Sequence, residues 1–547
     1  MDVVLIGLPG SGKSAVGRRL AARHGASFTD LDEVIEREAG VRIPEIFADE
    51  GEAGFRARER AVVAALGPPD PQPAIRRVIA PGGGAIVDPR NRWRLYRGRV
   101  PIWLDARPEV LAQRLRRSPT VRPLIVGRDP IRALRELTAA RGRFYGAATR
   151  IAGMAEVHGV VDAVDRAVAE AAAAPGTTLV RAETTLGRLS IGEGIAGRIV
   201  GEELARLGAG RAIVVSEPGA WGAVGPALER ALGAAGLPIE LVLLPQGEAA
   251  KTLGTIEAAA RELARRRVER GEALVAVGGG ALGDAAGFLA ATYLRGIPFI
   301  QVPTTLVAQI DSSIGGKTGV DLPEGKNLVG AFHQPVAIVI DVALLATLPE
   351  RERRAALGEA VKMAALGDER WFELLEARGA ALASGDPAAF EDGALAEVVE
   401  RCAWAKIEVV AADEKETAVR VALNLGHSLG HAFEAAGGYA DLRHGEAVAF
   451  GLRAACRIGV AAGVTPPERA ARVERALDAV GLGAGVLPYA LDAVLDHLGS
   501  DKKHRGGRLR WVLPTEAGSV VRDDVDPVLV RDIAAGLLAP MAVGGAV

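Results

Sequence analysis

The stretch GLPGSGKS at residues 7–14 fits the P-loop pattern, in which two glycines flank a short loop that ends in lysine and serine. It follows a short β-branched run, VVLI at residues 3–6, and precedes an amphipathic segment at residues 14–25. In this strand–loop–helix setting, backbone N–H groups surround phosphates, the lysine reaches the terminal ones and the serine can ligate magnesium. We therefore expect an α/β fold with a nucleoside triphosphate site, bound by Gly10, Ser11, Gly12, Lys13 and Ser14.

Length and composition set the broad class of the protein. The 547 residues exceed what one hydrophobic core supports, and 49% hydrophobic with 24% charged residues is typical of globular protein. A net charge of −2 gives no general attraction to nucleic acid or to an anionic membrane, and no apolar run reaches membrane-spanning length. The two cysteines, Cys402 and Cys456, fit a reducing compartment, and the N-terminal apolar run has no basic leader. We expect a cytoplasmic protein.

Lysine is rare in this chain. Lysine and arginine total 66, of which only nine are lysine. Because arginine fills most basic positions, the remaining lysines are favoured where a compact, hydrated ammonium group is needed. They are Lys13, Lys251, Lys317, Lys326, Lys362, Lys406, Lys415, Lys502 and Lys503.

Hydrophobic patterning divides the chain into three expected domains. Residues 1–172 alternate strand-like and helical runs, as expected for a P-loop α/β domain. A second alternation over 179–342, with strand-like runs at 212–217, 240–245, 273–279, 299–304 and 337–341, predicts a doubly wound dinucleotide-binding domain. Residues 343–540 are rich in Ala, Leu, Glu and Arg and predict a mainly helical domain.

Further motifs in the first domain point to its substrate. Together, in this order, FTDLD (28–32), GEAGFR (51–56), GGG (82–84), RPL (122–124) and the pair Arg141 and Tyr145 closely resemble the shikimate kinase family. The resemblance implies ATP with Mg²⁺ as co-substrate and shikimate as acceptor. Phosphoryl transfer depends on positioning and positive charge, and arginine pairs well with a carboxylate.

The resemblance also implies roles for individual residues. Ser14 and Asp30 would lie on the magnesium side, and Asp32 would hold the acceptor hydroxyl and act as base. Arg56, Arg141 and the backbone of Gly83 would bind the carboxylate of the acceptor. Arg122 would come from a lid to stabilise the transferring phosphate.

Two features of the second half bear on cofactors. GGGALGD at 278–284 contains G-x-G-x-x-G between an expected strand and helix, which alone is a weak dinucleotide signal; Glu217 is one candidate for the ribose-binding acid. His427, His431 and His444 fall within eighteen residues. Helical spacing places His427 and His431 on one face and by itself favours them as co-ligands of a metal.

A set of longer motifs in this half resembles the 3-dehydroquinate synthase family: GEAAKT (247–252), GGGALGD, YLRG (293–296), the stretches 301–321 and 325–335, LGEAVK (357–362), NLGHSLGHA (424–432), HGEAVAFG (444–451) and DKK (501–503). The resemblance implies zinc (or cobalt) held by Glu359, His427 and His444, with His431 turned toward substrate. It implies an NAD⁺-dependent cyclisation of 3-deoxy-D-arabino-heptulosonate 7-phosphate to 3-dehydroquinate with phosphate release.

This substrate carries a carboxylate and a phosphate, so a pocket rich in cations is expected. The residues that match the family's substrate pocket are Asp311, Arg295, Lys317, Lys326, Asn327, Lys362, Lys406, Arg420, Asn424, His431 and one of Lys502 and Lys503. Asp311, Lys317, Lys362 and His431 are the expected catalytic members. The residues that match the nucleotide side are Glu248, Lys251, Gly279, Gly280, Asp284, Thr304, Thr305, Lys317 and Lys326.

Three alternatives remain at this point. The second half could be a related sugar-phosphate cyclase that makes an aminocyclitol precursor, or a metal-dependent alcohol dehydrogenase, although the latter has no need of five pocket lysines. The first half could be a non-catalytic nucleotide-binding scaffold. The partners expected are small-molecule substrates, and a homodimer through the second half.

Overall fold

The computed structural model describes residues 1–117, 125, 127–152, 157–172, 174, 176–367, 369–483, 485–499, 504–505 and 508–539. The chain divides into two compact units. One comprises Met1–Gly210, Ala227–Pro238 and Ala337–Ala343, and the other comprises Arg211–Pro226, Ile239–Val336 and Leu344–Val547. The three domain boundaries expected from sequence stay predictions.

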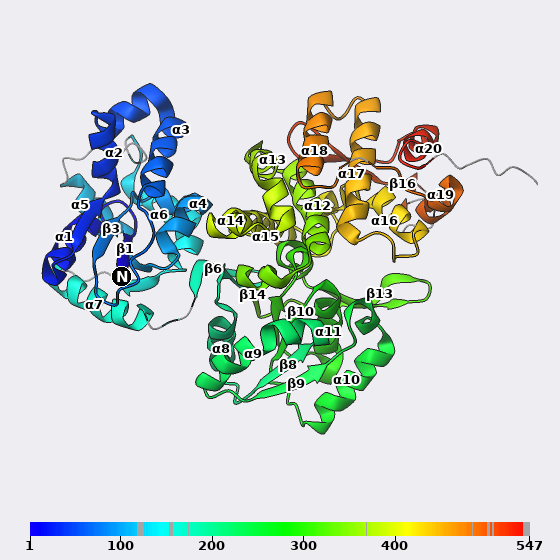
Figure 1. Ribbon diagram of the computed structural model, residues 1–547, viewed down its shortest axis with the longest axis horizontal. Coiled ribbons are helices and arrows are strands. Elements are labelled where there is room, and N and C mark those ends of the chain that lie inside the picture. Colours follow the sequence, from blue (N-terminus) through cyan, green and yellow to red (C-terminus); the bar gives the residue numbers. More distant parts are fainter. Residues whose placement is uncertain are drawn as a thin grey trace, which may run out of the picture. The chain divides into compact units, whose positions relative to one another are not determined.

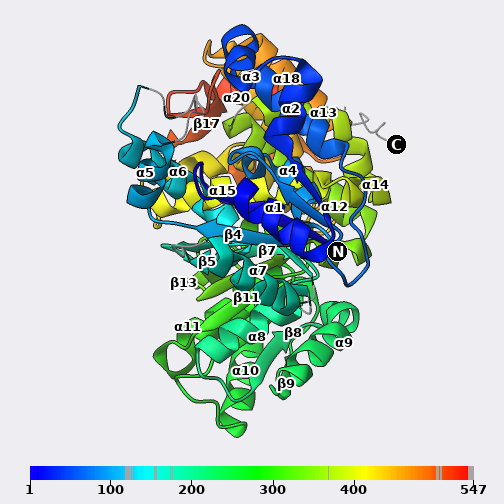
Figure 2. The ribbon, with the colours of Figure 1, turned by 90° about the vertical axis from the view of Figure 1, so that its left-hand side faces the viewer.

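The N-terminal part is built on a five-stranded parallel sheet with strand order β2-β3-β1-β4-β5. Its strands are β1 (Asp2–Ile6), β2 (Ser27–Asp30), β3 (Arg77–Ala80), β4 (Val100–Asp105) and β5 (Thr149–Ala152). The surrounding helices are α1 (Lys13–His24), α2 (Leu31–Ala39), α3 (Ile43–Ala64), η1 (Ala85–Val87), α4 (Pro89–Tyr96), α5 (Pro108–Arg116), α6 (Pro130–Tyr145) and α7 (Val157–Ala172). Helices α1 and α7 lie side by side and cover one face of this sheet (Figure 2).

Every residue of β1 is buried, which is typical of a central parallel strand covered on both faces. The P-loop follows it directly, and Gly10 and Gly12 adopt left-handed φ angles of 82° and 92°. Glycine has no Cβ to penalise this conformation, so the chain turns sharply into α1. The predicted α/β arrangement is confirmed.

A second sheet has seven strands in the order β6-β7-β14-β11-β10-β8-β9. The strands are β6 (Thr177–Thr184), β7 (Gly187–Glu193), β8 (Ala212–Ser216), β9 (Ile239–Leu243), β10 (Leu274–Gly278), β11 (Phe299–Pro303) and β14 (Ala337–Asp341). The five strands predicted from sequence are all present. The antiparallel β6–β7 hairpin was not predicted.

The helices associated with this sheet are α8 (Ala196–Arg206), α9 (Pro218–Ala234), η2 (Gly247–Ala250), α10 (Leu253–Arg265), α11 (Gly280–Thr292), η3 (Tyr293–Arg295) and η5 (Val342–Thr347). Helix α11 packs on β10 and β11, with Leu282, Phe288 and Leu289 in the core, and Asp284 is its one charged residue (Figure 1). A π-helical turn, η4 (Ala308–Ser312), and an antiparallel hairpin, β12 (Lys317–Leu322) with β13 (Gly325–Phe332), follow β11.

The C-terminal part is mainly helical, as predicted. Its helices are α12 (Glu350–Leu366), α13 (Glu369–Ser384), α14 (Pro387–Glu391), α15 (Ala394–Ala412), η6 (Val419–Asn424), α16 (His427–Ala436), α17 (His444–Ala461), α18 (Pro467–Ala479), α19 (Leu491–Gly499) and α20 (Pro527–Ala535). The short strands β15 (His504–Arg505), β16 (Arg508–Leu509), β17 (Trp511–Pro514) and β18 (Ser519–Arg522) form two hairpins. Helix α17 packs against both α12 and α16 (Figure 1). Within the described part of the chain, none of the helices is both long and apolar enough to span a membrane.

Candidate active sites

The P-loop joins β1 to α1 and brings the predicted phosphate and magnesium residues together. Lys13 Nζ donates to the carbonyl oxygens of Gly7 at 3.1 Å and Leu8 at 3.4 Å, so the ammonium lies over the loop. Ser14 Oγ donates to Asp30 Oδ2 at 2.6 Å. A hydroxyl beside a carboxylate at the start of a helix can hold magnesium next to bound phosphates.

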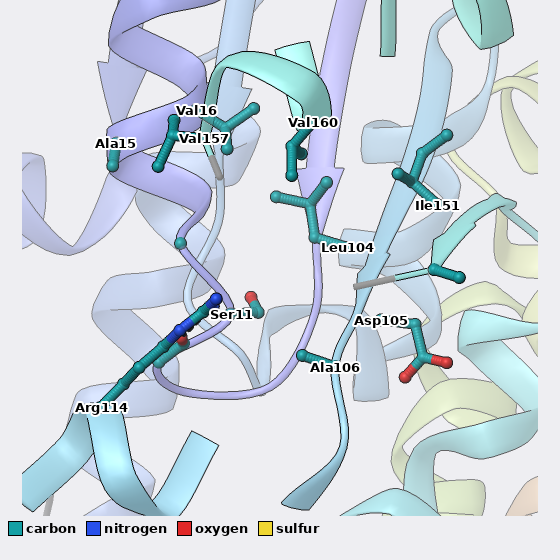
Figure 3. Close-up of a pocket in the computed structure, with 13 residues that line it drawn as sticks. Ser11, Ala15, Val16, Leu104, Asp105, Ala106, Arg114, Ile151, Val157 and Val160 are labelled. Atoms are coloured by element: carbon teal, nitrogen blue, oxygen red, sulfur yellow. Dashed lines mark hydrogen bonds between the residues drawn. The ribbon is translucent and has the colours of Figure 1, made fainter. Parts of the chain in front are cut away.

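Two pockets adjoin this loop, and both are lined by Gly10 and Gly12. The first has a volume of about 480 Å³ and is polar; Lys13, Asp30, Asp32 and Gly83 are among its lining residues. The second, of about 300 Å³, is mostly apolar and is shown in Figure 3; its apolar walls are formed by Val16, Leu104, Ile151, Val157 and Val160. Together the two pockets suit a nucleotide, because the apolar pocket can hold its flat base and the polar pocket its anionic phosphates.

Arg114 lines both pockets and was not predicted from sequence. It extends from α5 toward the P-loop (Figure 3), where Nη1 lies 3.5 Å from the carbonyl oxygen of Gly10. One arginine among the many of this chain carries no distinguishing sequence signal. Its position could be recognised only once α5 was placed beside the loop.

The glycines at 82–84 bring the expected acceptor residues together. A Cβ on Gly82 would lie 2.6 Å from Asp32 Oδ1, and a Cβ on Gly84 would lie 2.6 Å from the guanidinium nitrogens of Arg56. Arg141 Nη1 donates to the carbonyl oxygen of Gly83 at 2.7 Å. Asp32 and Arg56 therefore approach Gly82 and Gly84 more closely than a Cβ would allow without a shift of their side chains, and Arg141 binds the Gly83 backbone.

Arg56 is held by an acid that sequence reasoning missed. Glu59, only 1% exposed, accepts from Arg56 Nη1 at 2.8 Å. Burial raises the pKa of Glu59, although the charge of Arg56 opposes the shift. The spacing of three residues along α3 was the available signal, because it places both side chains on one helix face.

In the second half, the predicted glycine loop joins β10 to α11. Gly279 precedes α11 without any side-chain cap, so the first N–H groups of the helix are available to an anion. Glu217, at the end of β8, is buried and accepts from the Gly247 N–H at 2.7 Å through Oε2. Its Oε1 lies 3.9 Å from the position of a Cβ on Gly279, and Thr305 faces the same glycine. Glu217 therefore lies beside the glycine loop and stays a candidate for the ribose-binding acid.

The Glu217→Ala variant is expected to bind NAD⁺ about 10–100-fold more weakly, since hydrogen bonds to a charged group contribute about 1.5–3 kcal/mol. Titration calorimetry of NAD⁺ and NADP⁺ checks this. The Glu240→Ala variant, at a β9 acid whose ion-pair partner is Arg211, is the control. Unchanged NAD⁺ affinity in Glu217→Ala would remove Glu217 from the nucleotide site.

Lys251 links the nucleotide side to the β12–β13 hairpin. This buried ammonium lies 2.9 Å from Asp284 Oδ2 and donates to Asn327 Oδ1 at 2.5 Å. Asn327 adopts a left-handed φ of 56° near the start of β13. On the same strand, Lys326 Nζ lies 3.6 Å from Glu248 Oε1. The structure therefore brings together Glu248, Lys251 and Asp284, predicted on the nucleotide side, with Asn327, predicted in the substrate pocket, and Lys326, predicted for both.

Three histidines gather where α16 and α17 begin. One ring nitrogen from each of His427, His431 and His444 lies within 4.8 Å of the others. Glu359 Oε1, from α12, lies 3.5 Å from His427 Nε2 and 3.2 Å from His444 Nε2. His427 Nδ1 lies 3.0 Å from the carbonyl oxygen of Leu425, which leaves Nε2 for the cluster.

This donor set fits a divalent metal. Four-coordinate zinc holds nitrogen and oxygen ligands about 2.0–2.1 Å away, which separates any two of them by roughly 3.3–3.4 Å. The distances from Glu359 to His427 and His444 lie close to that separation. Burial raises the pKa of Glu359, but the charges of Lys362 and His427 outweigh this effect and hold that pKa well below its usual range. The carboxylate is therefore ionised, as a metal ligand must be.

Buried cations surround a single acid beside the cluster. Asp311, on η4, lies 2.9 Å from Lys406 Nζ and 3.9 Å from Lys362 Nζ. Lys362 also contacts Glu359 at 2.6 Å, and both lysines are buried. A further buried cation, Arg420, donates to the carbonyl oxygen of Gly315 at 3.2 Å. A concentration of buried positive charge of this kind suits an anionic ligand.

Glu416 is a second acid that sequence reasoning missed. It accepts from Asn424 Nδ2 at 2.5 Å and pairs with Lys317, and it adopts a left-handed φ of 59°. Glu416 lies four residues before Arg420 and eight before Asn424. Helical spacing could not reveal their proximity, because the segment 413–418 is not helical.

Some predicted residues are not joined to these clusters. Arg295, in η3, is exposed. Arg122, Lys502 and Lys503 lie outside the described residues. Their assigned roles stay predictions.

Comparisons with known proteins agree with both halves. The shikimate kinase family model matches residues 9–164, and the 3-dehydroquinate synthase N-terminal and C-terminal models match 241–355 and 356–504. The 3-dehydroquinate synthase of Synechococcus sp. (strain CC9605) is 46% identical over 316 residues, which cover 58% of this chain and 84% of that relative. The chain belongs to the shikimate kinase and 3-dehydroquinate synthase families. Another relative, the 3-dehydroquinate synthase of Paracoccus denitrificans (strain Pd 1222), is 43% identical over 63% of this chain and 94% of that protein.

Solved structures resemble the synthase half of this fusion. A 2-epi-5-epi-valiolone synthase from Streptomyces hygroscopicus subsp. jinggangensis 5008, with NAD⁺ and Zn²⁺ bound, has a TM-score of 0.55 and 29% identity over 60% of this chain and 90% of that one. A 2-deoxy-scyllo-inosose synthase complexed with carbaglucose-6-phosphate, NAD⁺ and Co²⁺ has a TM-score of 0.60 and 25% identity over 66% and 100%. The synthase half is more similar in sequence to 3-dehydroquinate synthases, at 43–46% identity, than to these two cyclases, at 25–29%. This difference disfavours the alternative that the half is another sugar-phosphate cyclase.

Proposed function

We propose that the N-terminal half transfers a phosphoryl group from ATP to a hydroxyl of shikimate. The arrangement of Asp32, Arg56 and Arg141 around the 82–84 glycines, next to Lys13, supports this most directly. The acceptor oxygen forms a bond to the terminal phosphorus while the bond to ADP breaks, and Asp32 takes the hydroxyl proton.

The other residues of this site position the reactants. Arg56 and Arg141 bind the acceptor's carboxylate, and Lys13 stabilises the negative charge on the phosphates. Ser14 and Asp30 hold magnesium. Arg114 and the apolar pocket hold the base of the nucleotide, and Arg122 is proposed as the lid residue.

The C-terminal half, we propose, converts 3-deoxy-D-arabino-heptulosonate 7-phosphate to 3-dehydroquinate and inorganic phosphate. The observation that carries this is the Glu359, His427 and His444 cluster beside buried Lys362 and Lys406. Zinc (or cobalt) and NAD⁺, when bound, supply polarisation of one substrate hydroxyl and its transient oxidation.

The residues of the chain bind and orient this substrate. Lys362, Lys406 and Arg420 neutralise its carboxylate and phosphate, while Asp311 keeps the two lysines in place. Lys317, Lys326, Asn327, Asn424 and Arg295 complete the pocket, with Lys502 as the proposed partner from the C-terminal segment. His431, which adjoins the metal ligands His427 and His444, faces the substrate.

On the nucleotide side, Gly279, Gly280, Thr304 and Thr305 surround the dinucleotide, and Glu248, Lys251 and Asp284 line it. Glu217 accepts hydrogen bonds from its ribose. We further propose that the protein is cytoplasmic and forms a homodimer through the synthase half.

Product assays with each half's substrate test the proposal. Purified protein with ATP, Mg²⁺ and shikimate is expected to release ADP in a shikimate-dependent manner. With NAD⁺, Zn²⁺ and the heptulosonate phosphate, it is expected to release phosphate and form a cyclic product identified by mass spectrometry. Nucleotide binding without shikimate-dependent ADP release would support the scaffold reading. Preference for a heptulose phosphate without the carboxylate would support the other cyclase.

A further inference from the structure

A buried carboxylate, Glu434, lies between the metal cluster and the β12–β13 hairpin. It is carried by α16, two helical turns after His427, and is only 7% exposed. Oε2 lies 3.2 Å from His444 Nδ1, and Oε1 lies 3.4 Å from Lys326 Nζ. Glu434 therefore bridges two residues with a separate oxygen for each: His444, a proposed metal ligand, and Lys326, a proposed cation of the substrate and nucleotide sites.

The contact with His444 fixes the orientation of its ring. His444 Nε2 faces Glu359 at 3.2 Å, so the two ring nitrogens have different partners. A carboxylate that accepts from Nδ1–H keeps the proton on that nitrogen and leaves the lone pair of Nε2 for a metal. It also raises the basicity of the ring as a ligand.

The contact with Lys326 ties the start of β13 to α16. Lys326 Nζ lies 4.7 Å from the ring centroid of Tyr439, which follows α16, and 3.6 Å from Glu248 on the nucleotide side. Tyr439 adopts a left-handed φ of 58°, a conformation that non-glycine residues seldom take. Lys326 thus contacts Glu434 and Tyr439 from the helical segment and Glu248 from the nucleotide side.

We propose that Glu434 is a positioning residue that orients His444 for the metal and ties this ligand to Lys326. The inference rests on the proposed zinc site. Because one carboxylate serves both partners, metal affinity and the placement of Lys326 are thermodynamically coupled through it.

The Glu434→Gln variant of the full-length chain tests the first part. It keeps the shape of the side chain and removes its charge, and its zinc affinity, measured by chelator competition, is expected to fall about 10–100-fold. The Co²⁺-loaded protein is expected to show a changed visible absorption spectrum. Glu397→Gln is the matched control, because Glu397 is also buried and pairs with Arg401 at 2.8 Å on α15. The zinc-free forms of both variants are expected to remain folded.

The Lys326→Met variant tests the coupling. It is expected to change zinc affinity by about threefold or more when Glu434 is present and to leave it unchanged in the Glu434→Gln background. Equal effects in both backgrounds would overturn the coupling. Wild-type zinc affinity and spectrum in Glu434→Gln would refute the positioning role. A wild-type chain that binds no zinc would refute the metal site itself.

Discussion

The Lys13→Met variant is expected to lose kinase activity by at least about 100-fold, with synthase activity unchanged. Lys13 is the cation of the P-loop, and its ammonium lies over the loop 3.1 Å from the carbonyl oxygen of Gly7. Removing one fixed positive group from the site where charge develops in the transition state costs about 10²–10³ in kcat. Methionine keeps an unbranched side chain, one atom shorter, and removes its charge and its donors.

Shikimate-dependent ADP release and phosphate release from the heptulosonate phosphate, measured on the same preparation, check this result. The control variant is Arg19→Met, at an exposed cation on the same helix, α1, and it is expected to retain both activities. Full kinase activity in Lys13→Met would exclude this P-loop as the phosphate site. A matching loss of synthase activity would show that the two sites are not independent.

The P-loop and the strands could be predicted because their signals are local. Lys13, Ser14 and the flanking glycines form one continuous motif, and the runs that became β8, β10, β11 and β14 are short apolar stretches ended by turn residues. A strand such as β10, buried at every position, needs no distant partner to be recognised.

The acids that orient the cations could not be predicted in the same way. Glu416 meets Lys317, which is 99 positions away, and Glu434 meets Lys326, which is 108 positions away. Such pairs form only once the hairpin lies against the helical segment, and a single sequence carries no record of them. Sequence spacing favoured His427 and His431 as co-ligands, whereas Glu359, from another helix, lies within 3.5 Å of His427 and His444.

The scarcity of lysine proved informative because burial of an ammonium group requires acidic partners. Lys251, Lys362 and Lys406 are all buried, and each lies within 3 Å of a site carboxylate. Lys415, which matched no motif, is exposed. Composition thus marked these lysines as candidate site residues, whereas their acidic partners are brought to them only by the fold.

The His444→Ala variant is expected to lose zinc and synthase activity while kinase activity remains. Loss of an outer-shell partner lowers metal affinity about 10–100-fold, and loss of a ligand is expected to exceed that range. Removing the ring also takes away the group that lies between Glu434 and Glu359, each of which is 3.2 Å from a ring nitrogen of His444. Elemental analysis after dialysis, together with phosphate release from the heptulosonate phosphate, measures both losses.

The control for this variant is His497→Ala, which changes an exposed histidine on α19 outside the cluster and is expected to keep its zinc. Retention of zinc by His444→Ala would make His444 a bystander and would favour the ligand pair His427 and His431. Loss of kinase activity alongside the zinc would instead indicate that the metal stabilises the whole chain. Because Lys13→Met and His444→Ala are expected to abolish opposite activities, the two variants together test whether one chain carries two independent sites.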